Sequence, residues 1–241
     1  MKHPFAALLL ICAATGAHAH HVWLEQNAQG AVLHFGEFGD NLRETSPGLL
    51  DKFPGPVARK LGPNGEAPVA LKKGAHGFVL NARAGQGETL LVEERAYPTS
   101  ERKEGEATVR SVYMPAARLA GDLSAHQPAL TLDLVPTGTR QGEAVEFQAF
   151  YKSQPLPKAK VEVVTPSGWR QERHTDASGK FSVPLPWSGP YALELSHRDN
   201  QPGERAGGDK YDRASYVTTL TVYQPTGIAP LPAGPAAQPN K

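Results

Sequence analysis

Two adjacent histidines, His20 and His21, directly follow a short apolar segment and are the residues best suited to chemistry. Residues 5–14 are mostly apolar, and Ala17 and Ala19 are the small residues that signal peptidase accepts at the −3 and −1 positions. Cleavage after Ala19 would make His20 the first residue of the exported chain. Its α-amine and imidazole, with the His21 ring, form the nitrogen-rich donor set that Cu(II) and Ni(II) favour. The spacing therefore predicts a transition-metal site at the mature N-terminus.

A second cleavage position is open. Thr15 is acceptable at −3, so the cut can also fall after Ala17 and leave His18-Ala19-His20 at the start of the chain. A histidine in third position can wrap Cu(II) or Ni(II) with amine, amide and imidazole nitrogens. Both processing choices lead to a metal-competent terminus. Because imidazole must be neutral to coordinate, metal affinity is expected to weaken as the pH falls below about 6.5.

The composition excludes several classes of function. The apolar leader is too short to span a bilayer, which takes about 20 residues, and no later segment approaches that length. Cys12 is the single cysteine and lies in the leader, so cysteine-ligated zinc, iron–sulfur clusters and thiol nucleophiles are excluded. Without Lys2, 24 of the 25 basic side chains remain against 24 acidic ones. This balance argues against nucleic acid or an anionic membrane as a partner.

No enzyme motif is present. The sequence has no Gly-x-Ser-x-Gly elbow, no phosphate-binding glycine loop and no dinucleotide fingerprint, so we expect a protein that is not an enzyme. Oxidative chemistry at a copper-loaded N-terminal histidine is a more remote alternative.

The first predicted domain, residues 20–127, is β-rich. Alternation in residues 21–25 predicts a strand, and residues 27–30 are a turn before a second strand at 31–38. The resulting hairpin would bring His34 near His21. Residues 46–53 predict a short helix with Ser46 as N-cap. Further strands are expected at 77–81, 88–94 and 108–113, and the charged segment 98–105 is expected to be a mobile loop.

The second predicted domain, residues 128–223, has seven short apolar runs separated by turns, as in an immunoglobulin-like β-sandwich. The runs lie at 130–134, 144–151, 160–165, 170–175, 180–184, 191–197 and 216–222. Gly179 closes a hairpin turn that needs a positive φ. Nothing indicates a parallel sheet. Residues 224–241 are rich in proline and alanine and nearly uncharged, which predicts a disordered tail. The fold class is therefore all-β, with two sandwich domains.

Several stretches resemble a family of exported bacterial proteins that is known mainly as a domain of unknown function. They are HHVWLEQ at 20–26, HFGEFGDNLRETSPGLLDKF at 34–53 and PGERAGGDKYDRASYVTTLTV at 202–222. Members of this family accompany nickel or cobalt uptake systems, and some are called NikK or NikM-like periplasmic components. Residues 156–195 also resemble transthyretin-like and carboxypeptidase-regulatory-like sandwiches. The resemblance implies a periplasmic accessory protein that binds a transition metal through His20 and His21 and hands it on.

Other ligands must come from distant strands. His197 is the preferred one, because it ends a predicted strand and opens a polar loop that carries Asp199 and Glu204. A surface histidine in a turn is the alternative interpretation. His34 is a further candidate through the predicted hairpin. Glu37 and Asp40 offer carboxylate oxygens, or else this segment forms a turn with a salt bridge between Arg43 and a neighbour.

The sequence thus predicts a periplasmic accessory protein for uptake or delivery of Ni(II), Co(II) or Cu(II). Its metal ligands would come from His20, His21, His197 and His34, and its partner would be a metal permease of the inner membrane. The alternative is a β-sandwich module that binds a protein or a glycan, or mediates adhesion, without a metal.

Overall fold

The computed structural model describes residues 20–240, and this part of the chain is built of β-strands joined by turns and loops, with one 3-10 turn and no α-helix. The predicted signal peptide, residues 1–19, lies outside the described residues, as does residue 241. The all-β prediction is confirmed. Across residues 20–240, no helix is long and apolar enough to cross a lipid bilayer.

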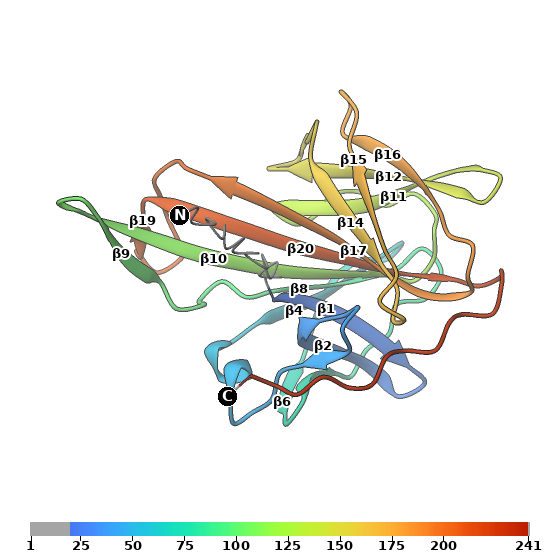
Figure 1. The fold of residues 1–241 in the computed structure, drawn as a ribbon, viewed down its shortest axis with the longest axis horizontal. Coiled ribbons are helices and arrows are strands. Elements are labelled where there is room, and N and C mark those ends of the chain that lie inside the picture. The colour runs from blue at the N-terminus through green and yellow to red at the C-terminus, as the bar shows by residue number, and fades with distance from the viewer. Residues whose placement is uncertain (1–19, 241) are drawn as a thin grey trace, which may run out of the picture.

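A nine-stranded sheet forms the middle layer of the molecule (Figure 1). Its main path has the order β15-β14-β17-β20-β10-β8-β4-β5, and β9 pairs with β10 beside that path. The first half of the chain contributes β4 (Val57–Gly62), β5 (Gly65–Val69), β8 (Thr89–Glu93), β9 (Ser100–Glu104) and β10 (Ala107–Ala120). The second half contributes β14 (Lys160–Val164), β15 (Arg170–His174), β17 (Gly189–Asp199) and β20 (Arg213–Gln224).

The two halves of this sheet meet in a parallel pair. Strand β10 pairs with β20 over nine residues, from Ser111 opposite Arg213 to Leu119 opposite Thr221. The expectation that no strands run parallel is therefore wrong. A parallel pair needs a long crossover, and here the whole second segment between the two strands provides it. The division of the chain at residues 127 and 128 stays a prediction, while hydrogen bonding joins both segments in one sheet.

Two smaller sheets flank the central one. The N-terminal sheet contains β1 (His21–Asn27), β2 (Gly30–Glu37), β3 (Leu42–Arg43), β6 (Leu71–Gly74) and β7 (Gly77–Leu80). The other contains β11 (Leu132–Gln141), β12 (Ala144–Tyr151), β13 (Gln154–Pro155) and β16 (Lys180–Pro184). A short hairpin joins β18 (Gly203–Glu204) to β19 (Lys210–Tyr211).

The flanking sheets cover opposite faces of the central sheet, as the alternation along β10 shows. Ala117 and Leu119 belong to the core under the N-terminal sheet, whereas Val112 and Ala120 belong to the core under β11, β12 and β16. Since successive side chains of a strand point to opposite faces, one central sheet serves two apolar cores. Figure 1 shows the N-terminal sheet below the central strands and the other sheet above them.

A fully buried ion pair connects β10 to the following strand, β11. Arg118 and Asp133 both have completely buried side chains, and two hydrogen bonds of 2.9 and 2.6 Å join them. The Asp133 carboxylate also accepts the backbone N–H groups of Ala129, Leu130 and Leu134. Buried charges are tolerated when paired and hydrogen-bonded in this way.

Most strands of the second segment match the predicted runs. Strand β12 and strand β16 have the expected bounds, and β14 and β15 differ by one residue from 160–165 and 170–175. Gly179 has a φ of 76°, which confirms the positive φ expected for its hairpin. A Cβ atom at this position would lie 2.8 Å from the Ala149 carbonyl oxygen, so the close approach of β12 also requires glycine.

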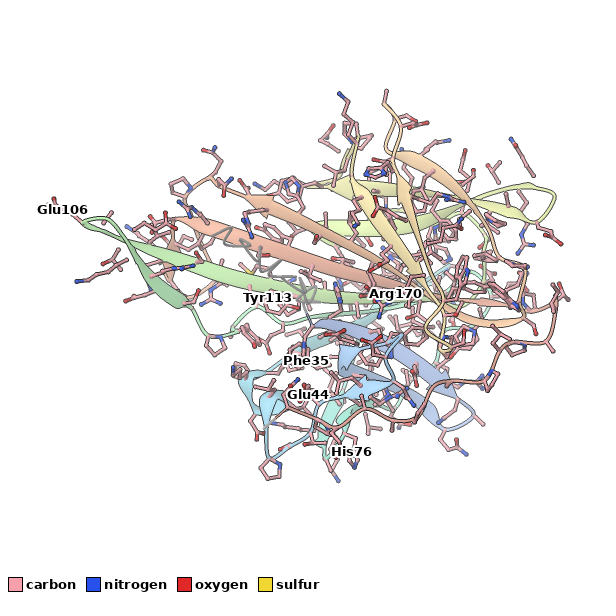
Figure 2. All side chains as sticks on the ribbon, in the orientation of Figure 1. Phe35, Glu44, His76, Glu106, Tyr113 and Arg170 are labelled. Atoms are coloured by element: carbon pink, nitrogen blue, oxygen red, sulfur yellow. The ribbon has the colours of Figure 1, made fainter. Side chains whose placement is uncertain are left out.

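Two predictions for the first segment need correction. Residues 98–105 are not a loop, because Ser100–Glu104 form β9 and pair with β10 in a protruding hairpin whose tip is near Glu106 (Figure 2). The predicted helix at 46–53 shrinks to a 3-10 turn, η1 (Leu49–Lys52). Its N-cap is Gly48 rather than Ser46, because the Asp51 carboxylate accepts the Gly48 N–H at 3.0 Å.

The tail also differs from the prediction of disorder. Residues 225–240 run in an extended path from the end of β20 back across the N-terminal sheet (Figure 1). The composition predicts that the tail buries little apolar surface, and most of its side chains are indeed exposed. Its order comes instead from backbone pairing at two points, Ile228 with Trp187 and Ala237 with Leu42.

We predict that Asp133→Asn destabilises the protein by about 3–5 kcal/mol, because it leaves the buried Arg118 guanidinium without its counter-charge. Urea unfolding measures the change. The control is Glu172→Gln in the exposed pair with Lys160, where a loss within about 1 kcal/mol is expected. Equal effects of the two variants would show that the buried pair does not hold β10 against β11.

Candidate functional site

The two N-terminal histidines face different parts of the structure. In the β1–β2 hairpin, Val22 lies opposite Phe35 and His21 lies opposite Gly36, which confirms the predicted hairpin. The His20 ring packs against Phe35, with ring centroids 5.2 Å apart. The His21 ring instead points to β17, where its Nδ1 lies 3.5 Å from a Glu194 carboxylate oxygen. Alternation of side chains along the strand explains this separation.

His20 is held by two glutamates and a tyrosine. Its Nε2 lies 2.6 Å from Oε1 of Glu44, and its Nδ1 lies 3.6 Å from Oε1 of Glu37. The Tyr113 hydroxyl on β10 donates a hydrogen bond of 2.8 Å to the His20 carbonyl oxygen. Burial raises the pKa of Tyr113, so it stays a neutral donor. Figure 2 shows Tyr113 on the central sheet, with Phe35 and Glu44 below it in the N-terminal layer.

Glu44 is the centre of this arrangement. Its side chain is fully buried. Besides the His20 ring, its carboxylate accepts the Asn240 backbone N–H at 3.1 Å and the Asn240 side-chain amide at 2.6 Å. The partners of this buried carboxylate therefore come from the two ends of the described chain. A buried carboxylate is costly unless donors or a cation satisfy it, so this position favours positive charge or N–H groups.

A second carboxylate, Glu194, lies beside His21. Together with Lys160, Glu162 and Ser196 the two residues line a surface cavity of about 90 Å³. Burial and the nearby charge of Glu162 raise the pKa of Glu194 to about 8, against the opposing effect of Arg170. Arg170 itself donates to Asp40 at 2.6 Å. Asp40 therefore forms a salt bridge, but with Arg170 and not with Arg43, which pairs with Glu25 at 2.8 Å.

His34 does not join the histidine pair. The register places Trp23, not His21, directly opposite His34, and the two rings are in contact at 5.4 Å between centroids. His34 Nδ1 lies 3.0 Å from the His76 carbonyl oxygen, and its Nε2 lies 3.6 Å from Glu25. Burial lowers the pKa of His34, so the ring is packed in its neutral form.

His197 lies on the other side of the central sheet. Leu193, Leu195 and His197 alternate on one face of β17, and the two leucines belong to the core under β11, β12 and β16. Glu194, the partner of His21, belongs to the opposite face. The His197 ring packs on Tyr151 with centroids 4.3 Å apart, and burial lowers its pKa. A sheet thus separates His197 from His20 and His21, and the structure does not bring them together.

Within residues 20–240, no three His, Cys, Asp or Glu side chains are already arranged to hold a metal ion. A partial set is formed by His20 with Glu37 and Glu44, which offers imidazole nitrogen and carboxylate oxygen. These donor types suit divalent ions of the first transition row. Cleavage before His20 would add an amine to the same set. The donors fit such an ion in kind, and binding requires them to move closer together.

Sequence reasoning missed the importance of Glu44 and Glu194. Glu194 could have been found, because a lone glutamate inside the apolar run Tyr191–Leu195 is out of place unless it has a partner. Glu44 gave no such signal, because it sits in a polar segment beside Arg43 and Thr45. Its burial becomes visible only in the fold, where His20 and Asn240 lie against it.

A comparison with family models gives a match to residues 17–199, and the matching model is described as a domain of unknown function, DUF4198. This chain belongs to that family. The match to the DUF4198 model starts just before His20 and extends to the end of β17. It therefore includes both histidines, Glu37, Glu44 and Glu194. A search of curated proteins finds no match to this DUF4198 protein. The expected membership of a family of unknown function is confirmed, whereas the nickel or cobalt association and the transthyretin-like second domain stay predictions.

We predict that Glu194→Gln stabilises the protein increasingly as the pH rises from 6 to 9. With a pKa raised to about 8, Glu194 is protonated in the folded state while the unfolded chain is ionised. The folded state of the unmodified protein therefore binds one proton more than the unfolded state, and this bound proton stabilises the fold at low pH. The stabilisation is lost as the pH rises through 8. Glutamine does not ionise, so the variant loses nothing over the same range. The advantage of the glutamine variant at pH 9 should be on the order of a few kcal/mol.

Thermal unfolding at pH 6, 7.5 and 9 measures this effect. Glu104→Gln, at an exposed position of β9 where the carboxylate pairs with Arg213, is the matched control and should show a pH-independent difference from the unmodified protein. A Glu194→Gln difference that stays constant with pH would contradict the buried, protonated state of Glu194.

Proposed function

We propose that this protein is exported, is processed to begin at His20, and binds a divalent transition metal there for uptake or delivery. The observation that carries the proposal is the contact of the His20 imidazole with the fully buried Glu44 carboxylate, with Glu37 at the other ring nitrogen. A buried carboxylate against a histidine provides two donors of different chemistry at one point. Nickel, cobalt and copper are the candidate ions, because imidazole and amine nitrogens suit them.

Processing and coordination act together in this proposal. Coordination requires a neutral imidazole and an ionised carboxylate, so a metal ion at His20 and Glu44 competes with protons for the same donor atoms. Cleavage after Ala19 supplies the α-amine as a further nitrogen next to this pair. Tyr113 holds the His20 carbonyl in place, so the start of the chain is positioned before any ion arrives.

The position of the site favours transfer over permanent storage. The His20 side chain is 21% exposed, so an ion on it remains open to incoming ligands from a second protein. In the periplasm, that second protein would be a metal permease of the inner membrane. The chain itself then acts as a carrier and catalyses no reaction.

A second candidate function is a binding module that needs no metal. A cavity of about 170 Å³ lies where β10 and β20 meet the β18–β19 hairpin, and it is lined by Met114, Tyr211 and Tyr216 among others. Arg95 and Glu204 add charge to the same cavity. Aromatic and charged groups around one hollow are typical of small-ligand sites. Under this alternative, the N-terminal histidines have only a structural role.

We predict that the processed protein binds Ni(II) or Cu(II) with a dissociation constant below the micromolar range, as measured by isothermal titration calorimetry at pH 7.5. His20→Ala or an extension of the N-terminus should abolish this binding, because either removes nitrogen donors. Glu44→Gln should weaken it by about 10- to 100-fold, since it removes the anionic partner of the ring.

His174→Ala is the matched control, because this histidine is 60% exposed on β15, and its contact is with Glu172 of the same strand. The affinity of the His174→Ala variant for Ni(II) or Cu(II) should equal that of the unmodified protein. Binding that survives His20→Ala, or no binding by the correctly processed chain, would overturn the proposed function and favour the metal-free binding module.

A further inference from the structure

The C-terminal segment, residues 225–240, is tied to the body of the protein at two successive points. Near its start, Ile228 pairs with Trp187, donates its N–H to the Pro186 carbonyl oxygen at 2.8 Å and accepts from the Ser188 N–H at 2.9 Å. Near its end, Ala237 pairs with Leu42 of β3. The segment therefore crosses from the turn before β17 to the edge of the N-terminal sheet, as Figure 1 shows.

Asn41 fastens the second point. Its side-chain amide donates to the Gly234 carbonyl oxygen at 2.8 Å, and its own carbonyl oxygen accepts the Ala237 N–H at 3.2 Å. Asn41 adjoins β3 and stands three residues before Glu44. These bonds direct the residues after Ala237 toward the buried carboxylate of Glu44.

Asn240 ends this path inside the candidate metal site. Its side-chain nitrogen lies 2.6 Å from Oε1 of Glu44 and 3.0 Å from Nε2 of His20. Its backbone N–H donates to the other carboxylate oxygen of Glu44 at 3.1 Å. An amide NH₂ group, with its partial positive charge, is therefore in contact with both the oxygen and the nitrogen that would hold a metal ion.

We propose that residues 225–240 form a strap that closes the His20–Glu44 site, with Asn240 as an internal competitor for the metal ion. This inference rests on the proposed function, because it concerns the same two donors. An ion that binds His20 and Glu44 must displace the Asn240 amide, and the end of the strap is then released. Reciprocally, a partner that pulls the strap away opens the site.

The strap is built to be released. Ile228 and Leu231, its two large apolar side chains, are 64% and 55% exposed, so its departure uncovers little apolar surface. A small number of hydrogen bonds hold the strap. Those at Asn240 are made to Glu44 and His20, the same residues that would bind a metal ion.

The test uses the complete processed chain and two variants, Asn240→Ala and Gln238→Ala. Gln238 is an exposed strap residue two positions earlier and serves as the matched control. Calorimetry with Ni(II) alone should show affinity raised about tenfold by Asn240→Ala and unchanged by Gln238→Ala. Hydrogen exchange of the amides in residues 225–240 should accelerate when Ni(II) binds the unmodified chain.

The outcomes separate the strap from the proposed function. Equal Ni(II) affinity of Asn240→Ala and the unmodified chain, with unchanged exchange of the strap, would overturn the strap while the metal site stands. Weaker binding by Asn240→Ala would also overturn it, because Asn240 would then be a ligand and not a competitor. If the unmodified chain binds no Ni(II), the proposed function fails. In that case Asn240→Ala and Glu44→Gln must still accelerate the hydrogen exchange of the backbone amides in residues 234–240. Unchanged exchange in both variants would show that the contact between Asn240 and Glu44 does not hold the strap.

Discussion

The parallel pairing of β10 with β20 is the constraint on which the rest of the structure depends. It joins strands from the two halves of the chain into one sheet, and that sheet supplies a face to each of the two apolar cores. Thr218 of β20 donates to the Leu132 carbonyl oxygen at 2.7 Å, so the same strand also holds β11 in place. Without this pair, the hydrogen-bonded sheet would not continue from β4 and β8 of the first half of the chain to β17 of the second.

The site near His20 is a consequence of that layering. Strand β1 lies over β10 and β20. There the Tyr113 hydroxyl of β10 donates to the His20 carbonyl oxygen, and the Glu194 carboxyl of β17 contacts the His21 ring. Residues from both halves of the chain therefore surround the two histidines. His20 and Asn240, which are 220 positions apart, both contact Glu44, and their donor groups satisfy its fully buried carboxylate.

Local features of the fold could be predicted from the sequence, and long-range ones could not. The strands of the second segment were visible because alternation and turn residues such as Gly179 act over a few neighbours. The β10–β20 pairing depends on two strands about a hundred positions apart, for which one sequence carries no local sign. The charged sequence of β9 resembles that of a loop, because all five side chains of this strand are exposed and no apolar alternation marks it. For the tail, composition described its exposure correctly but not the backbone pairing at Ile228 and Ala237.

For the candidate site, the residue types were predictable and their grouping was not. His20 and His21 stood out by position, yet alternation sends them to different carboxylates. His197 looked suitable as a metal ligand in the sequence, but it lies on the face of β17 that points away from His20 and His21. The measurement that tests the account most directly is anomalous X-ray diffraction from crystals of the processed protein soaked with Ni(II). The account predicts one dominant peak within about 2.0–2.2 Å of a His20 ring nitrogen and a Glu44 oxygen. A dominant peak at His197 or His174, or none at saturating Ni(II), would contradict it.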